Sequence, residues 1–411
     1  MQFFKRLFCS ALLPVVVTSA ILMAGGCVPP EEMLRNPLDE TAVRSEVVIG
    51  AALPLTGVHA SAGKEMLQGA QVAVGMLNSG RGIGGRRVRL EVADTRSTSS
   101  GARAAMRTLA LKGASAVAGG YSTTETAGLA SAADTERLPL AVACATADRF
   151  SNSGKFVFRI SCSDTQLAEG LAAYLWYWRQ IKTLAVLIDM RGEREYERNI
   201  ARSVAQSFSD IGGNVVRTAE YTDIESCVAA MRKVMGFGPQ AIMVPGVGSE
   251  AARMITALRK LGFSGVICGA DGWDSPEFFS TLGKKVDPGE CFFVSCFSSE
   301  YRDDEFAVFS ERFRKECFHY PNGRQTAMYD AVMMLGRCLG NINNVRQFRL
   351  NWLALQNYFG ACSVYNPLKS GNIDRMIFLN SVAPAGVNGE NPTARLIRSF
   401  MHSKLEGYIF E

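Results

Sequence analysis

The sequence contains very little histidine, which bears on metal binding. Only three histidines occur, His59, His319 and His402, and they lie far apart along the chain. The eleven cysteines include no Cys-x-x-Cys pair. Because structural zinc is held by closely spaced cysteine and histidine ligands, we expect no metal site.

The signatures of common enzymes and of nucleic-acid-binding proteins are also absent. The chain has no Walker loop, no Gly-x-Ser-x-Gly elbow and no His-Glu-x-x-His pair. Its net charge of +5 arises from 44 basic and 39 acidic residues, with no long basic run. We therefore expect neither an enzyme nor a partner of nucleic acid.

The overall composition is that of a globular protein. Hydrophobic residues make up 47% of the 411 residues and charged residues 20%. These shares are close to the average for folded domains. The length suffices for two or three domains with a sizeable buried core.

Residues 1–26 are predicted to form a lipoprotein signal peptide. Lys5 and Arg6 precede an uncharged run that ends in Ala24-Gly25-Gly26-Cys27. A basic start, an apolar stretch and small residues at the end are typical of a secretory signal. Small residues before a cysteine resemble a bacterial lipobox, so Cys27 is the expected lipidation site and membrane anchor. An uncleaved anchor helix and ordinary cleavage after a small residue are the alternatives.

Residues 27–44 differ from both the signal and the body. They contain three prolines and several charges but no apolar period. Such a composition is typical of a flexible tether.

Beyond residue 44 the apolar pattern alternates between that of strands and that of helices. The expected strands are Ser45–Leu55, Val88–Asp94, Ala116–Gly119, Leu138–Cys144, Thr183–Met190, Val215–Tyr221, Ala241–Val244 and Gly265–Gly269. The expected helices are Gly63–Leu77, Gly101–Leu111, Thr126–Arg137, 194–212, Ser226–Met235 and Glu250–Leu261. Repeated units of this kind predict an α/β fold with parallel sheets. The strands are too many for one such sheet, so we expect two lobes, with a first crossing at Phe156–Ser161.

The run Gly80–Gly85 formally matches the Gly-x-Gly-x-x-Gly fingerprint of dinucleotide sites. That fingerprint requires a strand before it and a helix after it. Here the order is reversed, which favours a helix end and a tight turn. We expect no nucleotide and no other cofactor.

Three loops follow expected strands and carry polar groups. The loop 119–126 places Ser122 and Thr123 before a helix, whose free N–H groups suit a carboxylate. Plain N-capping of that helix is the equal alternative. The loop at 144–147 supplies a further hydroxyl, and Gly269–Asp274 supplies carboxylates, although an Asp-Gly pair is also common in turns. Because ligands bind at the carboxyl ends of parallel strands, these loops are candidates for one crevice.

Taken in order, these segments resemble the branched-chain amino-acid binding proteins of ABC importers. The resemblance rests on the motifs Ala-Leu-Pro-Leu-Thr-Gly (52–57), Gly-Ala-Gln-Val-Ala-Val-Gly-Met-Leu-Asn (69–78), Gly-Ile-Gly-Gly-Arg (82–86) and Tyr-Asp-Ala (329–331), and covers about residues 46–385. It implies two doubly wound parallel-sheet lobes of the type I periplasmic binding protein fold, joined by a three-segment hinge. The implied lobes are 45–160 plus 298–358 and 161–297 plus 359–390, followed by an extension at 391–411. Within that extension, Ala394–Lys404 is a possible helix.

The resemblance also implies a ligand site. Thr123, with Ser122 beside it, falls on the family's carboxylate-binding hydroxyl. The loop Cys144-Ala145-Thr146 falls on the segment that holds the α-amino and α-carboxyl groups. Asp271 falls on the acid that pairs with the ammonium, and Tyr196 on the tyrosine that closes over the ligand.

These inferences predict an extracytoplasmic solute-binding lipoprotein that delivers an amino acid or a similar small polar solute to an ABC permease. The alternative is an envelope lipoprotein that uses the same fold as a sensory or protein-interaction module. Nine cysteines remain in the body of the chain, and in an oxidising compartment we expect some of them to pair.

Overall fold

A computed structural model describes residues 45–151, 153–192, 194–283, 287–340, 345–384 and 392–405. The predicted signal peptide, the lipidation site Cys27 and the tether lie outside these ranges. Within them, none of the helices combines the length and the apolar character needed to cross a bilayer.

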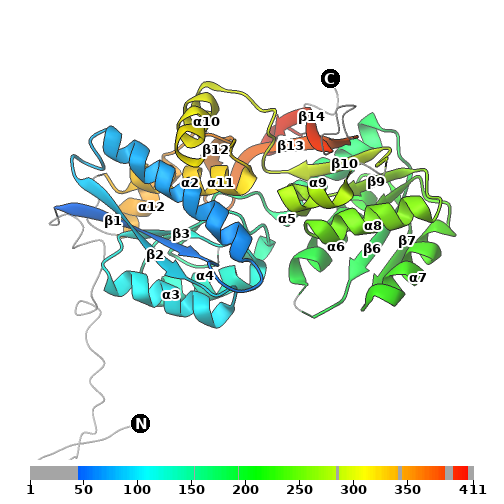
Figure 1. The fold of residues 1–411 in the computed structure, drawn as a ribbon, viewed down its shortest axis with the longest axis horizontal. Coiled ribbons are helices and arrows are strands. Elements are labelled where there is room, and N and C mark those ends of the chain that lie inside the picture. The colour runs from blue at the N-terminus through cyan, green and yellow to red at the C-terminus, as the bar shows by residue number, and fades with distance from the viewer. Residues whose placement is uncertain are drawn as a thin grey trace, which may run out of the picture. The chain divides into compact units, whose positions relative to one another are not determined.

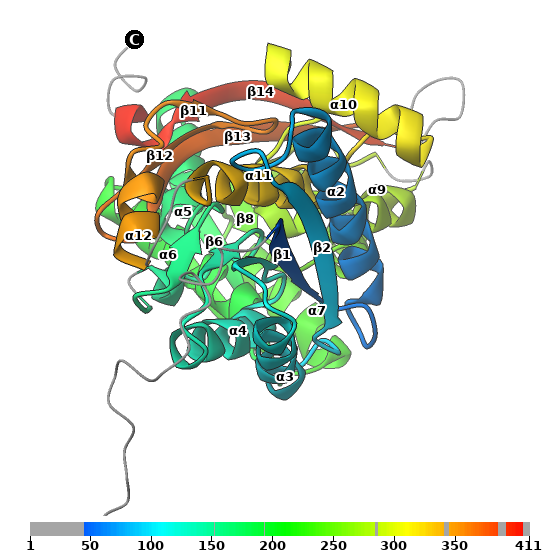
Figure 2. The same ribbon diagram turned by 90° about the vertical axis from the view of Figure 1, so that its left-hand side faces the viewer.

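The first lobe is built on a parallel sheet with the strand order β2-β1-β3-β4-β5. Its strands are β1 (Glu46–Leu53), β2 (Arg87–Asp94), β3 (Ala116–Gly119), β4 (Leu140–Val142) and β5 (Val157–Arg159). Its helices are α2 (Ala60–Ser79), α3 (Ser99–Leu111), α4 (Thr123–Thr135), η2 (Asp148–Phe150), α10 (Asp304–Cys317), α11 (Gly323–Cys338) and α12 (Val345–Leu353). Figure 2 shows α2 and α11 on one side of β1 and β2, and α3 and α4 on the other.

The central strand β1 explains this two-sided arrangement. Val47, Ile49 and Leu53 pack into the core beneath α2 and α11, whereas Val48 and Ala52 pack beneath α3 and α4. Side chains alternate between the faces of a strand, so a strand covered on both sides must be apolar throughout. The unbroken apolar run in the sequence therefore has a structural cause.

The second lobe contains the other parallel sheet, with the central order β10-β9-β8-β6-β7. Its strands are β6 (Thr183–Asp189), β7 (Asn214–Tyr221), β8 (Ala241–Met243), β9 (Val266–Gly269) and β10 (Cys291–Ser295). Its helices are α5 (Asp164–Ala173) with the π-helical turn η3 (Tyr174–Trp178), α6 (Glu195–Asp210), α7 (Ile224–Met235), α8 (Ser249–Lys260), η4 (Asp271–Trp273) and α9 (Pro276–Leu282). Both lobes are visible in Figure 1. The predicted α/β fold of two doubly wound lobes is confirmed.

The chain ends with antiparallel strands that were not predicted. These are β11 (Tyr358–Phe359), β12 (Val364–Pro367), β13 (Ile373–Ala383) and β14 (Thr393–Met401), followed by η5 (His402–Lys404). Strand β13 pairs with β12 at its start and with β10 and β14 further on. The helix expected at Ala394–Lys404 is wrong, because β14 extends the second sheet along β13.

The third crossing between the lobes also differs from its predicted position at 359. Ala361, Cys362, Tyr365 and Ile373 lie in the core of the first lobe. The hairpin of β11 and β12 thus packs with the first lobe, and the chain crosses along β13.

A buried arginine on β13 joins the three crossings. Arg375 is 1% exposed, and its guanidinium donates to the carbonyl of Ile160 on the first crossing (2.8 Å) and of Cys296 on the second (2.6 Å). It also stacks on the ring of Tyr365, 4.8 Å from the centroid. One side chain therefore fixes the geometry of the hinge.

The glycine-rich run at 80–85 is a helix end and a turn, as interpreted. The N–H of Gly80 caps α2 by donating to the carbonyls of Met76 and Leu77. The chain then reverses through a bridge between Ile83 and Arg86 before β2 begins.

Candidate functional site

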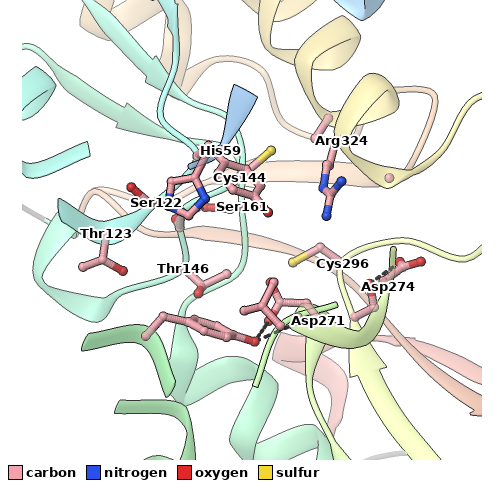
Figure 3. A pocket seen from close by; sticks show the side chains of 18 of the residues that line it. His59, Ser122, Thr123, Cys144, Thr146, Ser161, Asp271, Asp274, Cys296 and Arg324 are labelled. Carbon is pink, nitrogen blue, oxygen red and sulfur yellow. Dashed lines mark hydrogen bonds between the residues drawn. The ribbon is translucent and has the colours of Figure 1, made fainter. Parts of the chain in front are cut away.

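A cavity of about 610 Å³ lies between the two lobes. It is lined by loops at the carboxyl ends of β3, β4 and β9 and by the start of α6, the edge at which ligands bind in doubly wound sheets. The structure brings all the residues predicted as ligand contacts to this cavity, namely Ser122, Thr123, Cys144, Ala145, Thr146, Tyr196 and Asp271. Figure 3 shows several of them in place.

On the first-lobe wall, Ser122 and Thr123 have different surroundings. Gly120, with φ of +84°, turns the chain between β3 and α4. The Ser122 side chain accepts from the N–H of Glu125 at 3.3 Å, so it caps α4. Thr123 is the first residue of α4, and its hydroxyl makes no hydrogen bond within the described part of the chain. The Thr123 hydroxyl and the start of α4 are therefore available to an anionic group.

The neighbouring loop 144–146 is fixed by hydrogen bonds to Gly120 and Ser161. The N–H groups of Cys144 and Ala145 both donate to the carbonyl of Gly120, at 3.1 and 3.2 Å. The Ser161 hydroxyl donates to the Ala145 carbonyl at 2.6 Å. Thr146 is 2% exposed, and burial raises the pKa of the Cys144 thiol to about 12. This wall thus presents neutral groups in fixed positions.

The second-lobe wall carries a partly buried acid. The Tyr196 hydroxyl, near the start of α6, donates to Oδ1 of Asp271 at 2.7 Å and accepts from the N–H of Gly272 at 2.9 Å. Burial raises the pKa of Asp271 to about 6, although the Tyr196 hydroxyl opposes the shift. Backbone N–H groups of Asp271 and Gly272 also lower the pKa of this carboxyl. Within the described residues no cationic side chain pairs with Asp271, so its carboxylate is available to a cationic group.

Charged residues at the start of α6 also reach the cavity. Arg194 pairs with Glu197 at 2.8 Å and with Glu250 at 3.2 Å. Glu197 is only 5% exposed. The mixed charges of this segment resemble a solvated loop in sequence, yet part of them forms an ion network beside the cavity.

Sequence reasoning missed several further residues of the wall, and three of them carry polar groups that matter below. Arg324 on α11, Asp274 after η4 and Cys296 on the second crossing all line the cavity. Asp274 is the last residue of the loop Gly269–Asp274, which the sequence already marked as a candidate because it follows a strand and carries carboxylates. Arg324 and Cys296 come to the cavity only through folding, and no local pattern marks them.

The cysteines do not pair in the structure. The nine described cysteines are all free thiols, contrary to the expectation that some would be joined. Six of them are buried, where a thiol serves as a small apolar group. No group of three or more potential metal ligands occurs within the described ranges.

Comparison with known proteins places this architecture in a family. Residues 46–348, well over half of the chain, match the family model described as periplasmic binding protein. A Leu/Ile/Val-binding protein homologue from Brucella melitensis is 24% identical over 245 residues, which is 59% of this chain and 66% of the relative, slightly less than two thirds of its length.

Solved structures establish the same fold. A leucine-binding protein from Thermotoga maritima has a TM-score of 0.74 at 22% identity, covering 86% of this chain and 98% of that one. A branched-chain amino acid transporter substrate-binding protein from Streptococcus pneumoniae, in complex with isoleucine, has a TM-score of 0.73 at 22% identity and covers 86% and 99%. The predicted resemblance is confirmed, and the chain belongs to the periplasmic binding protein family.

Proposed function

We propose that this protein is an extracytoplasmic solute-binding lipoprotein that captures an amino acid, or a similar small polar solute, and delivers it to an ABC permease. The observation that carries the proposal is the opposed chemistry of the two cavity walls. Thr123, Thr146 and the start of α4 offer neutral donors, while Asp271 offers a partly buried carboxylate. A zwitterion complements both walls at once, because its carboxylate and ammonium need opposite partners.

Capture follows from closure of the lobes around the solute. Arg149 of the first lobe pairs with Glu195 of the second at 2.8 Å, and Arg324 lies 3.5 Å from Glu277. These contacts join the two lobes beside the cavity. A solute that touches both walls favours the form in which the lobes lie together over one in which they lie apart.

Delivery to a permease and attachment to the membrane rest on other support. Membership of the periplasmic binding protein family supports an extracytoplasmic location and a role in transport. The basic and apolar residues before Cys27 support export and lipid anchoring at that cysteine.

The sensory or interaction module has less support than transport. Such a module would use the extension at 391–411 as a docking element, but most of the described part of that extension is strand β14, paired along β13. It therefore completes the second sheet, which leaves it less free to serve as a separate docking element.

A thermal-shift screen with single amino acids tests the proposed function. Binding to the folded state alone stabilises it by about 2.7 kcal/mol when the ligand is present at 100 times its Kd. We expect at least one amino acid to raise the melting temperature, and Asp271→Asn to abolish that rise. No rise with any amino acid or other small polar solute would favour the sensory or interaction role.

A further inference from the structure

The cavity wall nearest the hinge is more polar than an aliphatic side chain requires. Arg324 of the first lobe and Asp274 of the second both line it, together with the thiol of Cys296. Figure 3 shows these three side chains grouped at one end of the cavity, away from Thr123. A ligand whose charged ends contact Thr123, Thr146 and Asp271 would direct its side chain toward this group.

Arg324 offers unused donors to the cavity. It is the second residue of α11. This helix approaches α2 closely at Gly69, where a Cβ would lie only 2.1 Å from the carbonyl oxygen of Gln325. Its Nη1 donates to Glu65 at 2.9 Å, and its guanidinium lies 5.4 Å from the centroid of the Tyr121 ring. Within the described residues, Nε and Nη2 donate no hydrogen bond, and the side chain is 13% exposed. The guanidinium points into the cavity (Figure 3).

Asp274 offers an acceptor on the same wall. Its Oδ2 accepts from the Ser295 hydroxyl at 2.8 Å, and Oδ1 has no partner within the described ranges. Burial raises the pKa of Asp274 to about 6, and the nearby Arg324 opposes that shift. At neutral pH the carboxyl is therefore mostly ionised and accepts hydrogen bonds.

The charges around Arg324 decide which side chain fits. Glu65 lies 2.9 Å from the guanidinium and Glu277 3.5 Å from it, so two carboxylates already offset the single positive charge. Arg375 at the hinge also lines the cavity, but with Asp274 added three carboxylates face the two guanidinium groups. This end of the cavity therefore has no net positive charge to attract an anionic side chain. A cationic side chain carries only donors and cannot accept from the free N–H groups of Arg324, and an aliphatic one would leave the polar groups of both residues unpaired.

We propose that the solute is an amino acid with a neutral carboxamide side chain, whose oxygen accepts from Arg324 and whose NH₂ donates to Asp274. This inference rests on the proposed function, since it takes the zwitterion contacts as given. A carboxamide carries one acceptor and two donors, which match the two groups without adding charge. A site built to hydrogen-bond a ligand group discriminates strongly against analogues that lack the group.

Calorimetric titration of the full chain with L-glutamine, L-asparagine, L-glutamate and L-leucine tests the inference. We expect glutamine or asparagine to bind at least tenfold more tightly than either of the other two. If leucine or glutamate binds as tightly or more tightly, the inference is overturned while the proposed function stands. If none of these four and no other amino acid binds, both are overturned.

Two variants separate recognition from folding. Arg324→Met removes the donors and Asp274→Ala removes the acceptor, and each should lower the affinity for the preferred carboxamide at least tenfold more than it lowers that for leucine. Arg107→Met, an exposed arginine on α3, is the matched control and should change neither. Thermal unfolding of the free variants checks that each folds, and the two variants test different lobes. Equal losses for glutamine and leucine in both variants would contradict the inference.

Discussion

The wall that the first lobe presents to the zwitterion consists of hydroxyls and backbone N–H groups, whereas the second lobe contributes a carboxylate and the tyrosine bonded to it. Thr123 and Thr146 are nearly buried without any charge of their own. Asp271, in contrast, is an acid whose pKa burial raises to about 6. Neutral donors bind a carboxylate at any pH, but an acid binds an ammonium only while it is ionised. The two lobes should therefore differ in how much each wall contributes and in how each responds to pH.

The largest effect should come from Asp271. Replacing it by Asn leaves the ammonium of a bound amino acid without a charged partner, which should weaken binding by about 2–4 kcal/mol. Calorimetric titration with the best amino acid from the screen measures the loss. Asp210→Asn, an exposed carboxyl at the end of α6, is the control and should leave the affinity unchanged. An affinity of Asp271→Asn within threefold of wild type would contradict the role of the second lobe in binding the ammonium.

Thr123→Val should have a somewhat smaller effect. The variant keeps the shape of the side chain but loses the hydroxyl that donates to the carboxylate, at a cost of about 1.5–3 kcal/mol for a hydrogen bond to a charged group. The same titration measures it, and Thr123→Ser should restore most of the affinity. Failure of serine to restore binding would mean that Thr123 contributes packing instead of a hydrogen bond.

The pH dependence of the affinity should reflect the ionisation of Asp271, because the threonine hydroxyls do not titrate. As pH falls through 6, Asp271 takes up a proton and loses its charge, while the ammonium of the solute keeps its proton. Affinity should therefore decrease below pH 6 and be about tenfold weaker at pH 5 than at pH 7. Titrations at several pH values measure this, with Asp271→Asn expected to give a flatter profile. An affinity that rises on acidification would contradict the assignment of Asp271.

The smallest effect should come from the ion pair between the lobes at the surface. Arg149 and Glu195 are 48% and 30% exposed, and exposed pairs contribute about 0–1 kcal/mol. Arg149→Ala should therefore lower the affinity by less than about 1 kcal/mol, with a loss that shrinks further at high salt. A loss comparable to that of Asp271→Asn would show that closure depends more on the exposed pair of Arg149 and Glu195 than on the cavity walls.

The sequence predicted the alternating core of the fold well because each unit carries its own signal. Strand β1 carries no polar side chain after Glu46, and α2 has the spacing of an amphipathic helix. The end of the chain was harder. Residues 394–404 contain charges that suit either a helix or an edge strand, and only pairing with β13 decides for β14.

The residues of the candidate site likewise fall into those that the sequence predicts and those that it does not. Ser122, Thr123, Thr146 and Asp271 lie shortly after strands, so the parallel-sheet rule brings each to the carboxyl edge of its own sheet. Arg324 and Cys296 reach the cavity because α11 packs on α2 and because the second crossing lies beside Cys162. Such placements depend on contacts between residues far apart in sequence, which no local pattern records.

The most direct test of the central claim compares an amino acid with its analogue that lacks the α-amino group. Calorimetric titration of the wild-type protein should give an affinity for the analogue about 30-fold weaker or more, because Asp271 then has no ammonium to bind. In Asp271→Asn the difference between the two ligands should nearly vanish. An analogue that binds wild type as tightly as the amino acid itself would contradict the account of the two walls.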